Sequence, residues 1–324
     1  MSLAIAMTRV GPPDVLQPID VQIGSPGPRE VLVNQSVIGV NFVDTYFRSG
    51  LYPVTTLPTV LGFEGAGVVV EIGKEVSHLR VGDRVAYAGA PLGAYAESRL
   101  LPEARLVKIP STLSFETAGS SMLRGLTAHM LLNKVHATKR GDWILVHAAA
   151  GGLGQIVVRW AKRLGANVIA TVGSAAKVEL ARAAGADFVL LHTNASWAED
   201  TVRLSEGKGV HLAIDGIGGA MVFHSLSVVR PFGVVASLGQ PAGPIAPVRV
   251  EDLGFTRSIS LTRPSSLLYA NDPELYRSGT AELMEMLVDG MVAPIGARYP
   301  FIEAARAHAD LESGRTTGSV ILTV

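Results

Sequence analysis

The clearest hydrophobic pattern in the chain runs from about residue 140 to residue 240. Residues 143–147 form one apolar run between Gly141-Asp142 and a glycine-rich turn, which predicts a buried parallel strand. From Leu153 to Leu164, apolar residues recur at offsets 0, 3, 4, 7, 8 and 11, which is one face of a helix that Gly165 ends. The same alternation predicts strands at 167–172, 187–191, 210–214 and 233–238, and helices at 175–184, 196–205 and 220–229. Alternating elements of this size predict a doubly wound parallel sheet with right-handed crossovers.

The segments on either side have a different pattern. Up to about residue 120, short apolar runs such as 31–33 and 67–71 are separated by Gly and Pro turns, which predicts a small barrel or sandwich. The tail predicts helices at 282–288 and near 302–311, and a last strand at 319–324. Because a terminal strand usually joins an existing sheet, we expect one domain made of 1–122 and 265–324, interrupted by a second domain at 123–264.

The turn after the first strand of the inserted domain points to a ligand. It carries Ala149-Ala150-Gly151-Gly152-Leu153-Gly154, which fits the dinucleotide fingerprint with Ala in place of the first Gly. Small residues let the backbone approach a pyrophosphate, and the free amide groups at the start of the helix point at it. A tight turn without a ligand is the alternative, but the strand before it and the helix after it favour a Rossmann-type dinucleotide site at Ala150, Gly151, Gly152 and Leu153.

The end of the second strand bears on which nicotinamide cofactor binds. An NAD site needs an acid about 20 residues after the fingerprint, to accept from the ribose 2′-hydroxyl. Here the strand ends in Gly173-Ser174, without an acid, and Lys177 follows. A hydroxyl and an ammonium attract a 2′-phosphate, although Lys177 can equally be a solvated helix lysine. We therefore favour NADPH over NADH.

Composition narrows the chemistry further. The chain has 324 residues, 28 basic and 28 acidic side chains, and no cysteine, which excludes disulfides, thiolate zinc sites, iron–sulfur clusters and a cysteine nucleophile. A net charge of 0 with only 17% charged residues argues against nucleic acid as a main ligand. No targeting segment is evident, and no apolar run approaches the ~20 residues that span a bilayer. We expect no membrane association, with the cytoplasm as the default location.

Several motifs together resemble one known family, the zinc-free quinone oxidoreductases of the medium-chain dehydrogenase/reductase superfamily (zeta-crystallin-like, bacterial quinone reductase branch). They span nearly the whole chain: 39–46 (GVNFVDTY), 48–53 (RSGLYP), 61–67 (LGFEGAG), 82–85 (GDRV), 124–128 (RGLTA), 147–154 and 262–265 (TRPS). The resemblance implies a Rossmann domain inserted in a GroES-like β-barrel catalytic domain.

The resemblance also implies which metal chemistry is missing. Zinc-dependent relatives have Cys where this chain has Asn41, and Gly-His-Glu where it has Gly62-Phe63-Glu64; the four-cysteine zinc lobe has no counterpart. None of the eight histidines forms a His-x-x-x-His pair, so we expect no metal. His129 and His136 fit an ordinary helix and its end, and His147 fits a structural histidine better than a catalytic one. Without zinc, alcohol dehydrogenation is disfavoured, whereas reduction of an activated acceptor is possible.

Site residues carried over from the family lie in several motifs. The resemblance implies that the nicotinamide is surrounded by Asn41, Tyr46, Tyr52 and Thr127. It implies further cofactor contacts at Gly173, Leu238, Gly239 and Arg263. Tyr52 matches a proposed proton donor of related enoyl reductases, but Tyr46 and Tyr52 can also be plain aromatic walls. On the 2′-phosphate the family implies Ser174, Lys177 and His192, where His replaces a frequent Tyr. The family's C-terminal arginine is displaced by one position here, to Arg315.

Three functions stay open, of which we favour the first. They are NADPH-dependent reduction of quinones, reduction of the activated C=C bond of enals or enones, and nucleotide binding with little turnover. The partner is then a small quinone or another activated acceptor. A homodimer is expected from the superfamily's habit of pairing Rossmann sheets at their edges, for which 233–238 with 258–262 is the candidate edge.

Overall fold

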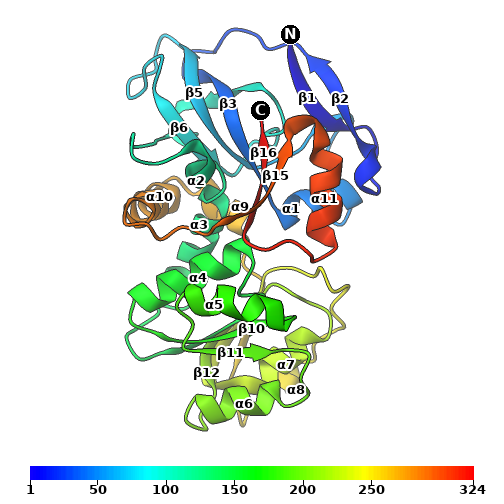
Figure 1. Cartoon of the computed structure of the whole chain (residues 1–324), viewed down its shortest axis with the longest axis vertical. Helices are drawn as coiled ribbons and strands as arrows, with labels where there is room; N and C mark the ends of the chain where they lie inside the picture. Colours follow the sequence, from blue (N-terminus) through cyan, green and yellow to red (C-terminus); the bar gives the residue numbers. More distant parts are fainter. The chain divides into compact units, whose positions relative to one another are not determined.

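All residues from 1 to 324 are described in the computed structural model of the chain, which falls into two units (Figure 1). The first contains Met1–Leu126 and Ser266–Val324, and the second contains Thr127–Ser265. The chain therefore leaves the first unit, completes the second, and returns.

The second unit is built on a six-stranded sheet. Its strands are β9 (Trp143–Val146), β10 (Asn167–Val172), β11 (Phe188–Leu191), β12 (Val210–Asp215), β13 (Val229–Ser237) and β14 (Ser260–Thr262). They are arranged in the order β11-β10-β9-β12-β13-β14, and every neighbouring pair is parallel. This is the doubly wound order, in which the strand sequence reverses between β9 and β12, and ligands bind beyond the carboxyl ends of such strands. The predicted Rossmann architecture is confirmed.

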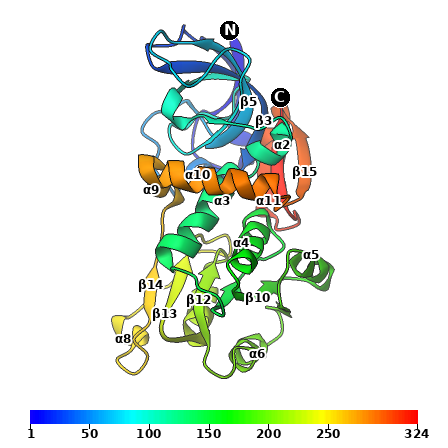
Figure 2. The ribbon, with the colours of Figure 1, turned by 90° about the vertical axis from the view of Figure 1, so that its left-hand side faces the viewer.

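Helices cover both faces of this sheet. On one face α4 (Gly152–Arg163) contacts β9 and β10, while α5 (Val178–Ala183), preceded by the 3₁₀ turn η4 (Ala175–Lys177), contacts β10 and β11. On the other face α7 (Met221–Val228) packs on β12 and β13, and α6 (Trp197–Leu204) packs on α7 (Figure 1). Figure 2 shows the short helix α8 (Val250–Leu253) beside β13 and β14. The chain enters this unit through α3 (Met122–His129) and the π-helical turn η3 (Met130–Val135), so His129 and His136 lie at a helix and its end, as predicted.

The first unit contains two sheets. The larger has the order β15-β16-β3-β5-β6-β8, with β7 also paired to β3, and the smaller has the order β2-β1-β4. Their strands are β1 (Ser2–Met7), β2 (Leu16–Val21), β3 (Glu30–Val40), β4 (Thr59–Val60), β5 (Glu64–Ile72), β6 (Arg84–Ala88), β7 (Ser98–Pro102), β8 (Val107–Lys108), β15 (Ile295–Pro300) and β16 (Ser319–Thr323). Since β16 pairs with both β15 and β3, the tail joins the N-terminal sheet as predicted.

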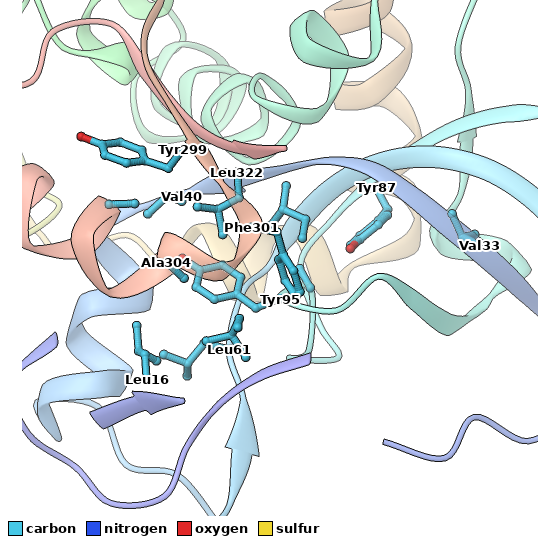
Figure 3. Packing of buried hydrophobic residues seen from close by; sticks show 14 of the residues in the cluster. Leu16, Val33, Val40, Leu61, Tyr87, Tyr95, Tyr299, Phe301, Ala304 and Leu322 are labelled. Carbon is cyan, nitrogen blue, oxygen red and sulfur yellow. The ribbon is translucent and has the colours of Figure 1, made fainter. Parts of the chain in front are cut away.

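One apolar core holds this unit together. Alternate residues of β3, such as Val31 and Val33, point inward and are fully buried. Figure 3 shows how the core draws side chains from β2, β3, β6, β15, β16 and α11 (Ala304–Glu312). The remaining helical elements are η1 (Pro13–Val15), α1 (Phe42–Ser49), η2 (Glu103–Arg105), α2 (Phe115–Gly119), α9 (Ser266–Asn271), α10 (Pro273–Val288) and η5 (Phe301–Glu303).

Among the boundaries that differ from the sequence prediction are the starts of α10 and β13. Helix α10 begins at Pro273 rather than residue 282, because Asp272 caps it by accepting the amide protons of Glu274 and Leu275, and Pro273 occupies the first turn. Strand β13 begins at Val229 rather than residue 233, and it lies between β12 and β14. Of the two segments proposed as a sheet edge, only the one containing β14 is an edge.

Candidate active site

The loop between β9 and α4 has the shape that the fingerprint predicts. Ala148 adopts a left-handed conformation at φ 50°, and Gly151 then precedes the first turn of α4 without any side-chain cap. A Cβ on Gly154 would lie 2.5 Å from the carbonyl oxygen of Ala148, so only glycine lets the loop fold over the helix start. Gln155 ties the loop down by donating to the carbonyl of Ala150 at 2.9 Å. The uncapped amide groups and the small residues fit a pyrophosphate.

The ends of β10 and β11 bring the second set of predicted residues together. Val172 pairs with Leu191 in parallel, and the amide of His192 donates to the carbonyl of Val172 at 3.1 Å. A Cβ on Gly173 would lie 3.3 Å from the imidazole of His192, so this ring rests against the glycine. Burial, and then the positive charge of Lys177, lower the pKa of His192. Ser174 is exposed at the start of η4, and no acidic side chain occupies this strand end.

A third group lies at the ends of β12, β13 and β14. Leu238 donates its amide to the carbonyl of Asp215 at 2.7 Å, and Arg263 donates to Gln240 at 3.4 Å. Asp215 itself is fully buried, and its Oδ1 accepts the amides of residues 217 and 218 at 2.7 and 3.0 Å. Leu238, Gly239 and Arg263 are thereby brought to the same edge of the sheet as the glycine-rich loop.

His147 has a structural environment. It is buried, its Nδ1 lies 2.7 Å from Thr171 Oγ1, and its Nε2 lies 3.1 Å from Ser225 Oγ. Burial lowers its pKa to about 3, so the ring is neutral. The sequence preference for a structural histidine agrees with this geometry. Thr127, also predicted at the site, is buried on α3.

In the first unit, Asn41 occupies the junction between β3 and α1. It is the N-cap of α1 and is held through its backbone N–H and its side-chain amide. Its backbone N–H donates to Asp44 Oδ2 at 2.8 Å, and its side-chain Nδ2 donates to Glu64 Oε1 at 2.7 Å. Because a carboxylate only accepts, the orientation of the Asn41 amide is fixed. Two buried carboxylates therefore position this residue.

Glu64 is a fully buried carboxylate at the start of β5. It also accepts the amide of Leu123 at 2.8 Å and Arg124 Nη1 at 2.9 Å, while Arg124 donates further to the carbonyls of Val40 and Ser120. Burial raises the pKa of Glu64, and Arg124 opposes that rise. A Cβ on Gly39 would overlap Glu64 Oε1, so the glycine makes room for the acid. The pair is complete in hydrogen bonds, which a buried ion pair requires.

Asp44 is the last member of a chain of polar contacts that ties α1 to α11. Arg48 Nη1 lies 3.4 Å from His308 Nδ1, His308 Nε2 lies 2.8 Å from the Tyr95 hydroxyl, and that hydroxyl donates to Asp44 Oδ2 at 3.1 Å. Since arginine only donates, His308 accepts at Nδ1 and carries its proton on Nε2, which in turn makes Tyr95 the donor to Asp44. Arg48 also makes a bidentate pair with Glu312 at 2.7 and 2.9 Å.

Burial raises the pKa of Asp44 to about 7 and lowers that of His308 to about 3. Asp44 Oδ1 is buried without a hydrogen-bond partner. Asp44 is therefore the member of this chain of contacts that changes its charge near neutral pH.

Tyr46 and Tyr52 form an aromatic corner. The two rings meet edge to face with centroids 5.4 Å apart, and the amide of Tyr52 donates to the carbonyl of Tyr46 at 3.0 Å. Phe47 packs against both Tyr52 and Phe63, with centroids 5.6 and 5.2 Å apart. Phe63 is thus part of this aromatic cluster and offers no ligand atom. No group of three or more His, Asp or Glu side chains has the arrangement to hold a metal ion.

Arg315 lies in the first unit and already has an acidic partner. Its guanidinium donates to Asp310 Oδ1 at 3.0 Å and to Ser313 Oγ at 3.1 Å.

Sequence reasoning missed the buried polar residues that support the site. Glu64 and Arg124 stood inside quoted motifs without a role, and Asp44, Tyr95 and His308 were not singled out. A usable signal was the placement of Glu64 and Arg124 in glycine-flanked apolar segments, where a charged side chain needs a buried partner. His308 had no such signal, because its partner Tyr95 is 213 positions away.

Comparisons with known proteins agree with this architecture. The family described as zinc-binding dehydrogenase matches residues 152–278, and the alcohol dehydrogenase GroES-like domain matches residues 27–111. No helix in the structure has both the length and the apolar character needed to cross a membrane.

Individual relatives match over their full length. A quinone oxidoreductase of Pseudomonas aeruginosa is 42% identical, with 99% of both chains covered. A 2-haloacrylate reductase of a Burkholderia species is 39% identical, again with 99% of both chains covered. The crystal structure of Escherichia coli quinone oxidoreductase complexed with NADPH superimposes with a TM-score of 0.95 at 37% identity, covering 99% of this chain and 100% of that one. The chain therefore belongs to the quinone oxidoreductases of the medium-chain dehydrogenase/reductase superfamily.

Proposed function

We propose that the protein is a zinc-independent NADPH:quinone oxidoreductase. The observation that carries the proposal is the full-length kinship with quinone oxidoreductases, one of them solved with NADPH. The end of β10 supports the choice of cofactor, because it offers Ser174 and Lys177 and no acid to repel a 2′-phosphate.

The residues of the second unit divide into three contacts with NADPH. Ala150, Gly151, Gly152 and Leu153 would hold the pyrophosphate, and Gly173, Ser174, Lys177 and His192 the adenosine end. Thr127, Leu238, Gly239 and Arg263 would hold the nicotinamide end. When bound, the nicotinamide supplies the hydride, and the protein supplies position and exclusion of water.

The first unit supplies Asn41, Tyr46 and Tyr52. Asn41 is held rigid by Glu64 and Asp44, which suits a group that must orient a ligand. The corner of Tyr46 and Tyr52 would offer an aromatic acceptor the face of one ring and the edge of the other. A quinone is electron-poor, so it can accept hydride without a Lewis acid, and the single proton that then completes the hydroquinone can come from water or from Tyr52.

The test follows NADPH oxidation with a naphthoquinone, with an alkenal and without acceptor, each with and without a strong metal chelator. We expect the naphthoquinone to give the fastest turnover, NADPH to exceed NADH in kcat/KM, and the chelator to have no effect. Turnover with the alkenal alone would refute quinone reduction, and loss of activity with the chelator would refute the zinc-free mechanism.

Reduction of an activated C=C bond is the second candidate. It is favoured by the kinship with a 2-haloacrylate reductase at 39% identity. This reaction places hydride on the β-carbon and a proton on the α-carbon. A carbanion at the α-carbon needs a positioned acid more than the oxygen of a reduced quinone does. Reduction of a C=C bond would therefore make the Tyr52 hydroxyl more important.

A homodimer formed through β14 completes the proposal. This edge strand is flanked by the exposed apolar residues Val250, Phe255 and Phe232, of which Phe255 is 98% and Phe232 84% exposed. An unpaired edge beside such residues is suited to pairing with a second copy. We expect Phe255→Glu with Val250→Glu to convert a dimer to a monomer in light scattering; a wild-type monomer would contradict the dimer.

A further inference from the structure

The first 73 residues of the chain contain no cysteine, no lysine and no histidine, and their three basic side chains are all arginines. The whole chain has the same bias, with no cysteine and with seven lysines against 21 arginines. The segment 1–73 includes Asn41, Tyr46 and Tyr52, the residues proposed above to face the acceptor, and the aromatic cluster around them. From this segment the acceptor would therefore meet phenol, phenyl and carboxamide groups, which are poor nucleophiles at neutral pH.

The lysines and histidines in the rest of the first unit are buried, paired or distant. His308 is fully buried, and both of its ring nitrogens have hydrogen-bond partners. Lys108 is held in a salt bridge at 2.8 Å. Lys74 and His78 follow the carboxyl end of β5, and the nine residues of this strand put about 25 Å between that end and Phe63 just before its start. We therefore expect no reactive amine or imidazole of this unit beside the aromatic cluster.

A quinone with an unsubstituted ring carbon is both a hydride acceptor and an alkylating agent. When a thiolate attacks that carbon, a C–S bond forms and the electron pair of the ring C=C bond moves to the carbonyl oxygen, which takes a proton. Transfer of the ring proton to the second oxygen then leaves a hydroquinone joined to the protein through sulfur, without any further reactant. At pH 7 an ordinary cysteine is about 3% thiolate and an ordinary lysine about 0.04% free amine, while arginine stays protonated. A segment with arginine as its only basic residue and with no cysteine escapes this reaction.

We propose that the acceptors of this protein include thiol-arylating quinones, which have an unsubstituted ring carbon, and that the protein reduces them without being alkylated at the acceptor site. This inference rests on the proposed quinone reduction and adds a substrate class to it. Addition of hydride and one proton converts the quinone to the hydroquinone, which is no longer a Michael acceptor. The protein therefore has to survive only the interval before hydride transfer, and residues 1–73 contain no cysteine, lysine or histidine that could attack the ring during it.

The first measurement compares two quinones as acceptors for the full-length protein with NADPH. In 1,4-benzoquinone all the ring carbons that a nucleophile attacks are unsubstituted, whereas in duroquinone each of them carries a methyl group. NADPH oxidation is followed with each quinone, after subtraction of the rate without protein. We expect 1,4-benzoquinone to be reduced at least as fast as duroquinone, with an initial rate that a second addition of both substrates restores in full.

The second measurement tests alkylation directly. The protein is incubated with excess 1,4-benzoquinone in the absence of NADPH, desalted and assayed with duroquinone, and peptide mass spectrometry locates any adduct. We expect wild type to keep its duroquinone activity. Leu51→Cys, which puts a thiol beside Tyr52 at a residue that is 44% exposed, should lose activity at least about tenfold faster than the matched Leu51→Ser. Val81→Cys, at a 63% exposed residue of the turn before β6, should take up the quinone and stay active.

The outcomes separate this inference from the function on which it rests. Circular dichroism and the duroquinone rate before incubation show whether each variant is folded and active, and the wild-type measurements need no variant. Inactivation of wild type as fast as Leu51→Cys would overturn the inference, wherever the adduct lies, and so would full activity of Leu51→Cys once its thiol carries the quinone. Reduction of duroquinone but not of 1,4-benzoquinone would overturn the substrate class and leave quinone reduction intact. Reduction of neither quinone would overturn the proposed quinone reduction itself.

Discussion

Replacing Asp44 by asparagine removes a buried charge while keeping the size and shape of the side chain. In the native protein Asp44 is fully buried and its pKa is raised from 3.8 to about 7, chiefly by burial. The folded protein therefore binds more protons than the unfolded chain between these two values. Stability must fall as the pH rises through this window, because ionising Asp44 inside the fold is unfavourable.

The magnitude follows from the two pKa values. Each unit of difference is worth about 1.4 kcal/mol, so the limiting effect is about 4 kcal/mol, and the part that falls between pH 5 and pH 8 is about 2.5 kcal/mol. In Asp44→Asn the new amide nitrogen takes the place of Oδ1, which has no partner in the native protein. A buried donor without an acceptor costs about 1–3 kcal/mol, but this cost is the same at both pH values.

The assay is urea unfolding of wild type and Asp44→Asn at pH 5 and at pH 8, followed by far-ultraviolet circular dichroism. We expect the free energy of unfolding of the variant, relative to wild type, to improve by about 2.5 kcal/mol from pH 5 to pH 8. Asp20→Asn, at an exposed carboxylate on β2, is the control and should leave the pH dependence unchanged. Parallel pH dependences for wild type and Asp44→Asn would refute the view that Asp44 is protonated in the fold near neutral pH.

Three further predictions address the cofactor, the acceptor and the buried pair. Lys177→Glu places a negative charge at the 2′-phosphate subsite and should raise KM for NADPH at least about tenfold in initial-rate kinetics; a similar rise for NADH would contradict the subsite. Tyr52→Phe should change naphthoquinone turnover by less than about threefold but lower any alkenal reduction by about 10²-fold or more, since only the latter needs a positioned acid; equal losses would make Tyr52 part of the pocket wall alone. Gly39→Ala should destabilise the protein by about 3 kcal/mol in urea unfolding, because the new methyl group displaces the Glu64 carboxylate from its partners. Gly24→Ala is its control, as nothing lies within 4 Å of the added methyl group, and equal effects of the two would refute the argument.

The second unit was predictable because its information is local. Each strand and helix carries its own periodicity, and the doubly wound order then places the ends of β9, β10 and β11 side by side. The sequence could therefore predict that the loop at Ala150–Leu153 and the pair of Lys177 and His192 lie at one edge of the sheet.

The buried polar contacts that hold the candidate site residues of the first unit in place were not predictable in the same way. The hydrogen bond between Tyr95 and His308 joins residues 213 positions apart, and the contact of Arg48 with His308 spans 260 positions. No periodic pattern encodes such pairs, since each partner alone is an ordinary tyrosine, histidine or arginine in an amphipathic segment. Only the pairing of β16 with β3, which brings the tail back to the N-terminal sheet, makes them neighbours.

The position of β16 between β15 and β3 also sets the order in which the two units can fold while the ribosome synthesises the chain. Residues 127–265 contain all six strands of their sheet, so this unit can close while later residues are still being synthesised. The larger sheet of the first unit cannot be completed until β16 has been synthesised, because β16 is an inner strand of that sheet and follows all its other strands in the sequence. Until residues 319–323 emerge, the edge of β3 that β16 will occupy is an open strand edge, which exposes nascent chains to association with one another.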